Sequence, residues 1–222
     1  DPLGRYYRLP PYGTAMKLPT LSIPPAAAAG TVRQGASVID VSGSGRFMGV
    51  RLTQALPRSG ALQQTIGASL EDRFLENSST VAGQRLLPDV GSRVLSLQYT
   101  FRNEPAWGLV GGSVDYAWNI GGGSHNTLQD HADNGGERSW KALRFSLEAA
   151  TPLGDWALSG RLRGQYSRDT MIRAEQFGLG GVNSVRGFPD RIRSGDYGFQ
   201  WGVEALGPNV GPGEWPLRPV LF

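Results

Sequence analysis

Apolar and polar residues alternate along most of this chain. In segment 93–101, Leu95, Leu97 and Tyr99 would share one face of an extended chain, with Ser96 and Gln98 on the other. Successive side chains of a strand point to opposite faces, so the pattern predicts strands with one apolar and one polar face. Clear alternation covers 93–101, 107–120, 140–150, 155–167 and 196–206, weaker alternation covers 31–41, 45–56 and 61–75, and a short start appears at 218–222.

The length of these segments favours a membrane barrel over a soluble β-sandwich, although both would show alternation. Several segments reach the roughly 9–11 residues that a tilted strand needs to cross a bilayer, whereas soluble strands usually have about 5–6. Aromatic residues also gather at segment ends, as in the interfacial girdles of outer-membrane barrels. These residues are Trp107, Trp118, Trp140, Trp156, Tyr166 and Tyr197.

The connections between segments alternate in length. Short turns are predicted at 57–60, 103–106 and 151–154, and long loops at 76–92, 121–139 and 168–195. Outer-membrane barrels have short periplasmic turns and long extracellular loops. We therefore predict an antiparallel transmembrane β-barrel with 168–195 on the extracellular side.

The register of the alternation predicts which residues face lipid and which face the lumen. The expected lipid-facing residues are Leu97, Tyr99, Val114, Phe145, Leu162 and Trp201. The expected lumen-facing residues are Arg144, Glu148, Arg161, Arg163 and Glu204.

Composition agrees with this fold class. The hydrophobic content is 39% and the mean hydropathy is −0.29, with no apolar run long enough for a transmembrane helix. Barrel strands average out to such mild hydrophilicity. The chain has no Cys, and its pI of about 9.4 comes from scattered Arg rather than a basic block, so we expect no nucleic-acid partner. No signal-peptide pattern opens the chain, and we expect it to be a fragment of a longer protein.

Other candidate chemistry is weak. Segment 178–181, Gly-Leu-Gly-Gly, lacks the strand–loop–helix setting and the Lys-Ser/Thr of a phosphate-binding loop. His125 and His131 lie near Asp130 and Asp133 in one predicted loop, which leaves open a metal site or a barrel enzyme with an Asp/His site. We expect these histidines to be solvated loop residues, and we predict no enzyme activity, cofactor, metal or small-molecule substrate.

One ordered motif carries more information than composition. It begins with Glu175-Gln176-Phe177, continues through Gly180-Gly181 to Val185-Arg186-Gly187-Phe188, and is followed by Gly195-Asp196-Tyr197-Gly198 and Glu204. This motif resembles the sixth-loop signature of outer-membrane secretion and assembly barrels, in which a long loop folds back into the pore. Its spacing is most similar to the TpsB branch, the two-partner secretion transporters or haemolysin secretion/activation proteins.

The resemblance implies a domain organisation. Segment 155–167 would be the family's eleventh strand, 168–195 its sixth loop, and 31–222 about eight to nine strands of a sixteen-stranded barrel. The periplasmic POTRA domains of the family would lie outside this chain. Residues 1–30, rich in Pro and Ala, are predicted to form a loop or a disordered end.

The resemblance also singles out Arg186. In the family this arginine meets an aspartate of a Phe-x-Asp-x-Gly motif on the thirteenth strand, and this chain ends where that motif would begin. A guanidinium can grip a carboxylate through two parallel hydrogen bonds. The possible lumen partners in this chain are Asp115, Glu148 and Glu204.

The implied function is an outer-membrane pore of a Gram-negative cell that passes an unfolded exoprotein, a haemolysin or adhesin, without nucleotide hydrolysis. Its expected partners are that exoprotein and the lipid bilayer. A BamA-like assembly factor is the alternative within the superfamily. The Asp/His barrel enzyme and a soluble β-sandwich adhesin remain as alternatives of other classes.

Overall fold

The computed structural model describes residues 28–34, 37–77, 80–81, 84–85, 87–181, 184–185, 187–189, 191–211 and 217–222. The long strands are β2 (Ser37–Ala55), β3 (Gln63–Asn77), β6 (Val90–Asn103), β7 (Leu109–Ile120), β8 (Lys141–Leu153), β9 (Trp156–Tyr166) and β12 (Gly198–Leu206). The shorter elements are β1 (Ala28–Gln34), β4 (Thr80–Val81), β5 (Gln84–Arg85), α1 (Leu128–Asp133), β10 (Phe177–Leu179), β11 (Arg193–Gly195) and β13 (Val220–Leu221).

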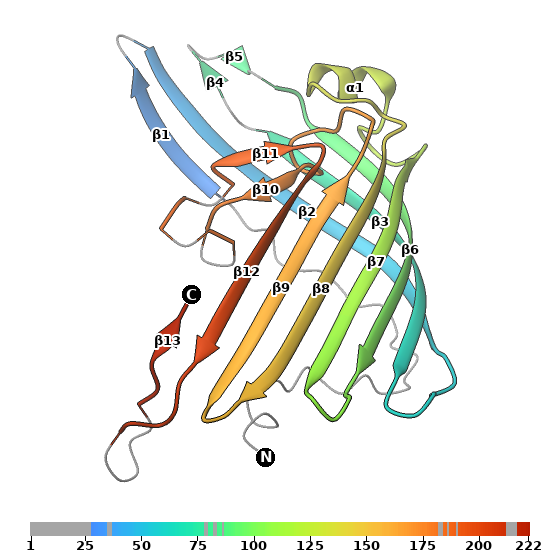
Figure 1. The fold of residues 1–222 in the computed structure, drawn as a ribbon. Coiled ribbons are helices and arrows are strands. Elements are labelled where there is room, and N and C mark those ends of the chain that lie inside the picture. The colour runs from blue at the N-terminus through green and yellow to red at the C-terminus, as the bar shows by residue number, and fades with distance from the viewer. Residues whose placement is uncertain are drawn as a thin grey trace.

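Eleven strands form one antiparallel sheet, and long strands that follow each other along the chain are neighbours in it. The order is β13-β12-β9-β8-β7-β6-β3-β2-β4-β5, with β1 also paired to β2. The sheet bends into a curved wall (Figure 1). The prediction of an all-β, antiparallel, partial barrel is confirmed.

The predicted strand boundaries agree with the structure to within a few residues, except near the N-terminal end. The prediction placed one strand at 31–41 and the next at 45–56. Instead, β1 ends at Gln34 and β2 runs without a break from Ser37 to Ala55. The small residues Gly43 and Gly45 weaken the alternation, but both pair with β3, opposite Asn77 and Leu75. Continuous pairing therefore extends a strand that the side-chain pattern divides.

The connections alternate in length as predicted. The strand pairs β2–β3, β6–β7 and β8–β9 are joined by short connections at one end of the wall (the lower end in Figure 1), which we call the turn end. The longer connections between β3 and β6, β7 and β8, and β9 and β12 lie at the opposite, loop end, where α1, β4 and β5 are found. The connection from Leu206 of β12 to Val220 of β13 departs from the pattern, because it is long and lies at the turn end. The helix α1 and the small hairpin β10–β11 lie inside predicted loops and were not anticipated.

The register gives the wall two different faces. Asp115 pairs with Arg144, Glu148 with Arg161 and Gln200 with Arg163, so these polar residues share the inner, concave face. The outer face carries apolar side chains such as Leu97, which is 53% exposed. The register places every residue of the predicted facing sets on its predicted side of the wall.

One aromatic residue departs from the predicted girdle. Trp140 is fully buried, although it was predicted to lie at a membrane interface. It belongs to a small apolar core at the loop end that also contains Val94, Ala117, Ala142 and Met171. Met171 comes from the segment that follows β9, so this core fixes the start of loop 168–195 against the inner wall. Among the described residues, no helix is long and apolar enough to span a membrane.

Candidate functional site on the inner wall

Loop 168–195 returns to the inner face directly after leaving β9. Met171 and Ile172 are 1% and 2% exposed. The backbone N–H of Met171 donates to the Asp196 carboxylate at 2.9 Å, and the Thr170 carbonyl accepts from the N–H of Glu137 at 2.7 Å. The loop is therefore held both by its own far end and by the neighbouring loop 121–139.

The first residue of the sequence motif, Glu175, forms the centre of an ion cluster on the inner wall. Its side chain is only 4% exposed. One Arg73 nitrogen, Nη1, donates to both carboxylate oxygens at 3.0 and 2.7 Å, and Nη2 of Arg144 donates to Oε2 at 3.0 Å. A loop carboxylate is thus bound by two guanidinium groups from strands β3 and β8.

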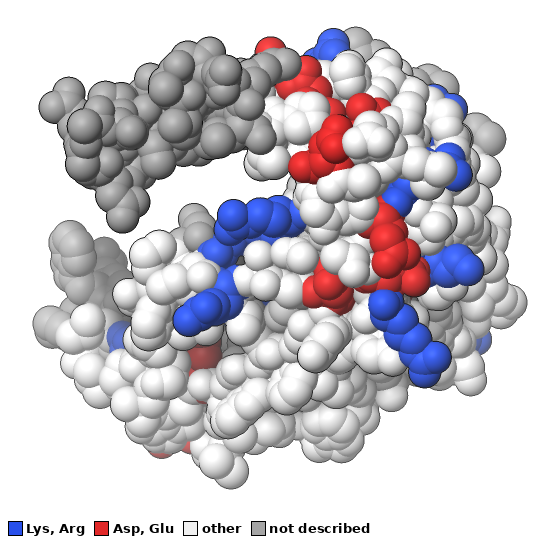
Figure 2. Space-filling view, turned by 90° about the horizontal axis from the view of Figure 1, so that it is seen from above, with Lys and Arg blue, Asp and Glu red and all other residues white. Residues whose placement is uncertain are grey.

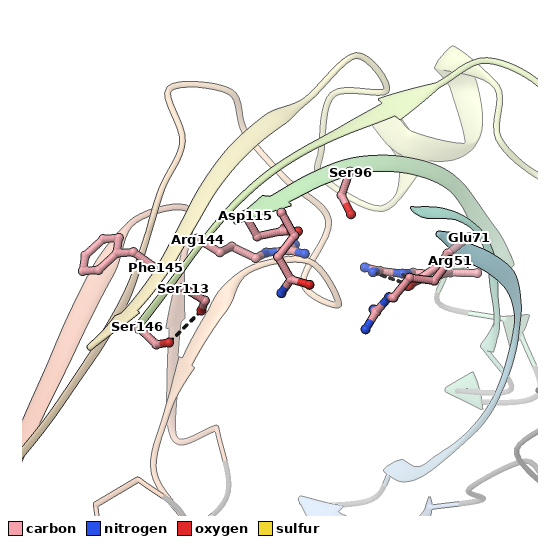
Figure 3. A pocket seen from close by; sticks show the side chains of 10 residues that line it. Arg51, Glu71, Ser96, Ser113, Asp115, Arg144, Phe145 and Ser146 are labelled. Atoms are coloured by element: carbon pink, nitrogen blue, oxygen red, sulfur yellow. Dashed lines mark hydrogen bonds and ion pairs between the residues drawn. The ribbon is translucent and has the colours of Figure 1, made fainter. Parts of the chain in front are cut away.

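The cluster continues along the wall. Glu71 accepts from Nε and Nη2 of Arg73 at 3.2 and 2.8 Å, and from Arg51 at 3.4 Å. Arg51, Glu71 and Arg144 line a cavity in the wall's concave side, where Asp115 also points (Figure 3). Phe145, the next residue after Arg144, points away from that space (Figure 3). Three arginines and two glutamates make this ionic cluster, which we call the Glu175 cluster.

Gln165 on β9 connects the Glu175 cluster to the loop backbone. Its Oε1 accepts from Nε of Arg144 at 2.8 Å, and its Nε2 donates to the Glu175 carbonyl at 3.0 Å. Gln165 is 5% exposed, so neither bond is open to bulk water. Buried polar groups that satisfy each other in this way fix one loop position, because each unpaired group would carry a desolvation cost.

The next motif residues form the hairpin β10–β11. Phe177 pairs with Gly195 and Leu179 with Arg193. The Gln176 side chain donates to Asp196 at 3.1 Å and accepts from Ser194 at 3.1 Å. The start and the end of the loop are therefore closed on each other beside the inner wall.

Gly180 and Gly181 follow the hairpin with positive φ angles of 114° and 87°. A Cβ at Gly180 would lie 2.2 Å from the Pro189 carbonyl oxygen, so no larger residue fits there without displacing backbone. The N–H of Gly181 donates to the Phe188 carbonyl at 3.0 Å. This bond holds Gly181 and Phe188 next to each other.

Three residues of the predicted tip are described. Val185 and Phe188 are 41% and 54% exposed, and Gly187 has a φ of 87°. A second tether lies beside it, because the Ser184 hydroxyl donates to Gln200 on β12 at 2.5 Å, and Gln200 also accepts from Arg163 at 3.1 Å. Arg186 itself lies outside the described residues.

The predicted partners of Arg186 lie on the inner face, on three different strands. Asp115 is on β7, Glu148 on β8 and Glu204 on β12. Which carboxylate meets Arg186 stays a prediction. The carboxylate that the structure does place at the centre of a cluster is Glu175, which the sequence motif contained but to which no partner was assigned.

Arg73 and Glu71 were not identified as site residues from the sequence. They stand two apart in a segment with weak alternation, so both side chains point to the same face of β3. A Glu-x-Arg pair on the polar face of a predicted strand was the available signal. Its partner in the loop could not be read, because Glu175 is far from β3 in the sequence.

Loop 121–139 corrects the prediction that both histidines are solvated. His131 is fully buried in α1, and its Nε2 lies 2.9 Å from the Gly91 carbonyl and 3.0 Å from Oδ1 of Asn126. Two acceptors at Nε2 indicate that this nitrogen carries the proton. Burial lowers the pKa of His131, against the opposing effects of the Gly91 carbonyl and Asp130.

Asp130 has a structural role in the same loop. Its carboxylate accepts from the Thr127 hydroxyl at 2.6 Å and from the Thr127 N–H at 3.0 Å, which completes a capping box at the start of α1. The hydrogen bond from the Thr127 hydroxyl lowers the pKa of Asp130. Within the described residues, no group of three or more His, Cys, Asp or Glu could hold a metal ion.

A curved antiparallel wall with a polar inner face and an apolar outer face is the architecture of a membrane β-barrel. The family model for haemolysin secretion/activation protein ShlB/FhaC/HecB matches residues 20–204. The chain belongs to this family, whose members are TpsB-type outer-membrane secretion transporters.

Solved structures share the fold. CdiB from Escherichia coli superposes with a TM-score of 0.73 at 18% identity, over 87% of this chain and 36% of that one. CdiB from Acinetobacter baumannii gives a TM-score of 0.59 at 21% identity, over 78% of this chain and 30% of that one. The chain thus spans about a third of the length of these proteins. Among curated protein sequences, none matches this chain.

Proposed function

We propose that this protein lies in the outer membrane of a Gram-negative cell and passes an unfolded partner exoprotein, a haemolysin or adhesin, to the cell surface. In this proposal 31–222 is part of the pore wall and 168–195 is the sixth loop, which occupies the lumen in the resting state. Of the predicted loop or disordered end at 1–30, residues 1–27 lie outside the described residues and Ala28–Gly30 belong to β1. The membership in a secretion family and the polar inner face support the proposal.

The observation that carries the proposal is the burial of Glu175 between Arg73 and Arg144. A loop carboxylate that is held by two strands of the wall keeps the loop inside the lumen. Every bond in this tether is polar, so water or a passing polar chain can replace it. The loop therefore suits the role of an element that must hold the pore closed and still move aside.

The proposed transport needs neither nucleotide nor metal, because the exoprotein would cross in an extended form and its folding outside the cell would supply the driving free energy. We assign the tip residues Val185, Arg186, Gly187 and Phe188 to positioning the loop during transport. Arg186 would bind a lumen carboxylate through its planar fork of donors.

Secretion by Arg186 variants of the full-length protein tests this proposal. Arg186→Ala should reduce secretion strongly while the barrel still inserts, and Arg186→Lys should be nearly as defective because an ammonium loses the planar fork. Arg58→Ala, at an exposed turn on the opposite end, is the matched control. Normal secretion by both Arg186 variants at normal membrane levels would contradict the assigned role.

A further inference from the structure

The outer face of the wall carries a regular row of cations at the loop end. On three strands, β2, β6 and β8, the apolar outer-face run is followed, at the next outward-facing position toward the loops, by Arg or Lys. Beyond the end of β9, Arg168 follows Tyr166 by two residues and donates to its hydroxyl. The pairs, apolar residue first, are Met48 and Arg46, Leu95 and Arg93, Leu143 and Lys141, and Tyr166 and Arg168. We call the four cations the outer basic row.

The position of the row is one-sided. In the described residues of the seven long strands, all the remaining Lys and Arg residues lie on the inner face by register. These inner residues are Arg51, Arg73, Arg102, Arg144, Arg161 and Arg163. The outer face near the turn end carries neutral residues instead, such as Gln54 on β2 and Gln64 on β3. Cations on the outer face of these strands are thus restricted to one membrane boundary.

Most of the row is available to a ligand. Arg46, Lys141 and Arg168 are exposed. The Arg46 guanidinium lies 5.1 Å from the Phe74 ring centroid, and Nε of Arg168 donates to the Tyr166 hydroxyl at 3.0 Å, so aromatic side chains support both. Seen from the loop end, several basic side chains lie at the margin of the molecule (Figure 2).

Three carboxylates lie near the row, and one of them pairs with Arg93. Asp72 accepts from Nε and Nη2 of Arg93 at 2.7 and 2.9 Å. Glu76 also faces outward on β3 and accepts from the Ser44 hydroxyl at 2.8 Å. Asp169 accepts from the backbone N–H of Lys141 at 2.8 Å. Four cations against three carboxylates, Asp72, Glu76 and Asp169, leave a net charge of one positive unit at this boundary.

We propose that the outer basic row binds the phosphate groups of a phosphorylated glycolipid in the outer leaflet. The apolar run below the row would contact the acyl chains, and Tyr166 would lie at the headgroup level, where aromatic residues of barrels concentrate. Guanidinium groups bind phosphate through paired hydrogen bonds, and long basic side chains extend from apolar surface toward headgroups. The inference rests on the proposed outer-membrane location but not on secretion.

The first test measures how much lipid stays bound to the full-length protein. The protein is extracted from outer membranes in mild detergent, and its bound lipid is quantified by native mass spectrometry. Lys141→Gln/Arg168→Gln should retain roughly tenfold less phosphorylated glycolipid, because each cation near an anionic headgroup layer contributes to binding. Arg58→Gln/Arg102→Gln, which removes the same charge near the turn end, should retain the wild-type amount. Equal retention by the two double variants would overturn the proposal.

The second test identifies the ligand. The protein is reconstituted in phosphatidylethanolamine vesicles with bis-phosphorylated glycolipid, the same glycolipid dephosphorylated, or phosphatidylglycerol, and its thermal transition is measured. Only phosphorylated glycolipid should raise the transition, and the charge-preserving Lys141→Arg/Arg168→Lys should keep that rise. An equal rise with phosphatidylglycerol, or its loss on adding inorganic phosphate, would reject a glycolipid site.

Failure of the two proposals can be told apart. Protein that fractionates outside the outer membrane would contradict the proposed function and this inference together. Protein in the outer membrane that fails to select the glycolipid contradicts this inference alone. Normal lipid retention with no secretion by the wild-type protein contradicts the proposed function alone.

Discussion

Removing the charge of Glu175 is the most direct way to weaken the loop's attachment. Glu175→Gln keeps the side-chain length but replaces a carboxylate that accepts three hydrogen bonds from Arg73 and Arg144. Removing one partner of a buried ion pair costs about 3–5 kcal/mol. Since 21% and 28% of the two arginine side chains are exposed, water compensates part of that loss. We expect a loss of about 2–3 kcal/mol for the loop-in state, which raises the loop-out population roughly 30- to 150-fold.

Single-channel recording of the full-length protein in planar bilayers measures this change. Glu175→Gln should raise the frequency of large-conductance openings, and a cysteine at Ser184 should react faster with an impermeant thiol reagent. Glu104→Gln is the matched control, because it removes a carboxylate from the exposed Arg102–Glu104 pair near the turn end. If the Glu175 variant opens no more often than this control, the Glu175 cluster does not hold the loop.

Three further predictions follow from the geometry. Gly180→Ala should loosen segment 177–181 and reduce secretion, because strained backbone costs about 1–3 kcal/mol. Gly202→Ala, which has open space around it, should leave secretion unchanged in the same secretion assay. Burial lowers the pKa of His131, so the neutral imidazole stabilises loop 121–139 fully above the unfolded pKa of about 6.5, and this stabilisation is lost as the pH falls below that value. Amide hydrogen exchange in this loop should therefore accelerate between pH 7.5 and 5. In His131→Gln the loop amides should exchange faster than in the wild type at pH 7.5, and this pH dependence should disappear. Leu97→Arg, on the outer face, should lower unfolding free energy in vesicles by about 2–4 kcal/mol, and an equal loss for the inward-facing Gln98→Arg would reverse the assigned faces.

Much of the wall could be predicted from the sequence because its two faces meet different solvents. Each long strand alternates between an apolar outer side and a polar inner side, so the period-two pattern survives in the sequence. The prediction failed where that contrast is weak, as at Gly43 and Gly45, which carry no side chain to mark a face. It also failed at Trp140, because an aromatic residue at a strand end has the same sequence pattern whether it lies at an interface or in a core.

The site was predictable in part. The ordered motif identified Glu175 as part of an inward-folding loop, and alternation placed Arg144 on the inner face. Their contact, and the second arginine Arg73, depend on which strands lie opposite the loop, and local patterns carry no such information. His131 was missed for the same reason, since its burial comes from Gly91 and Asn126 rather than from neighbouring α1 residues.

The two kinds of attachment along loop 168–195 suggest how it could move without unfolding. At its start, Met171 is buried in the apolar core with Trp140, and separating such surfaces exposes apolar area to water at a cost of about 25 cal/mol per Å². Farther along, Glu175 and Ser184 are held by Arg73, Arg144 and Gln200 through polar bonds that lumen water can replace. A force on the loop should therefore release the polar tethers before the apolar anchor. The loop would swing about the Met171 end, and the same anchor would return it to the inner wall.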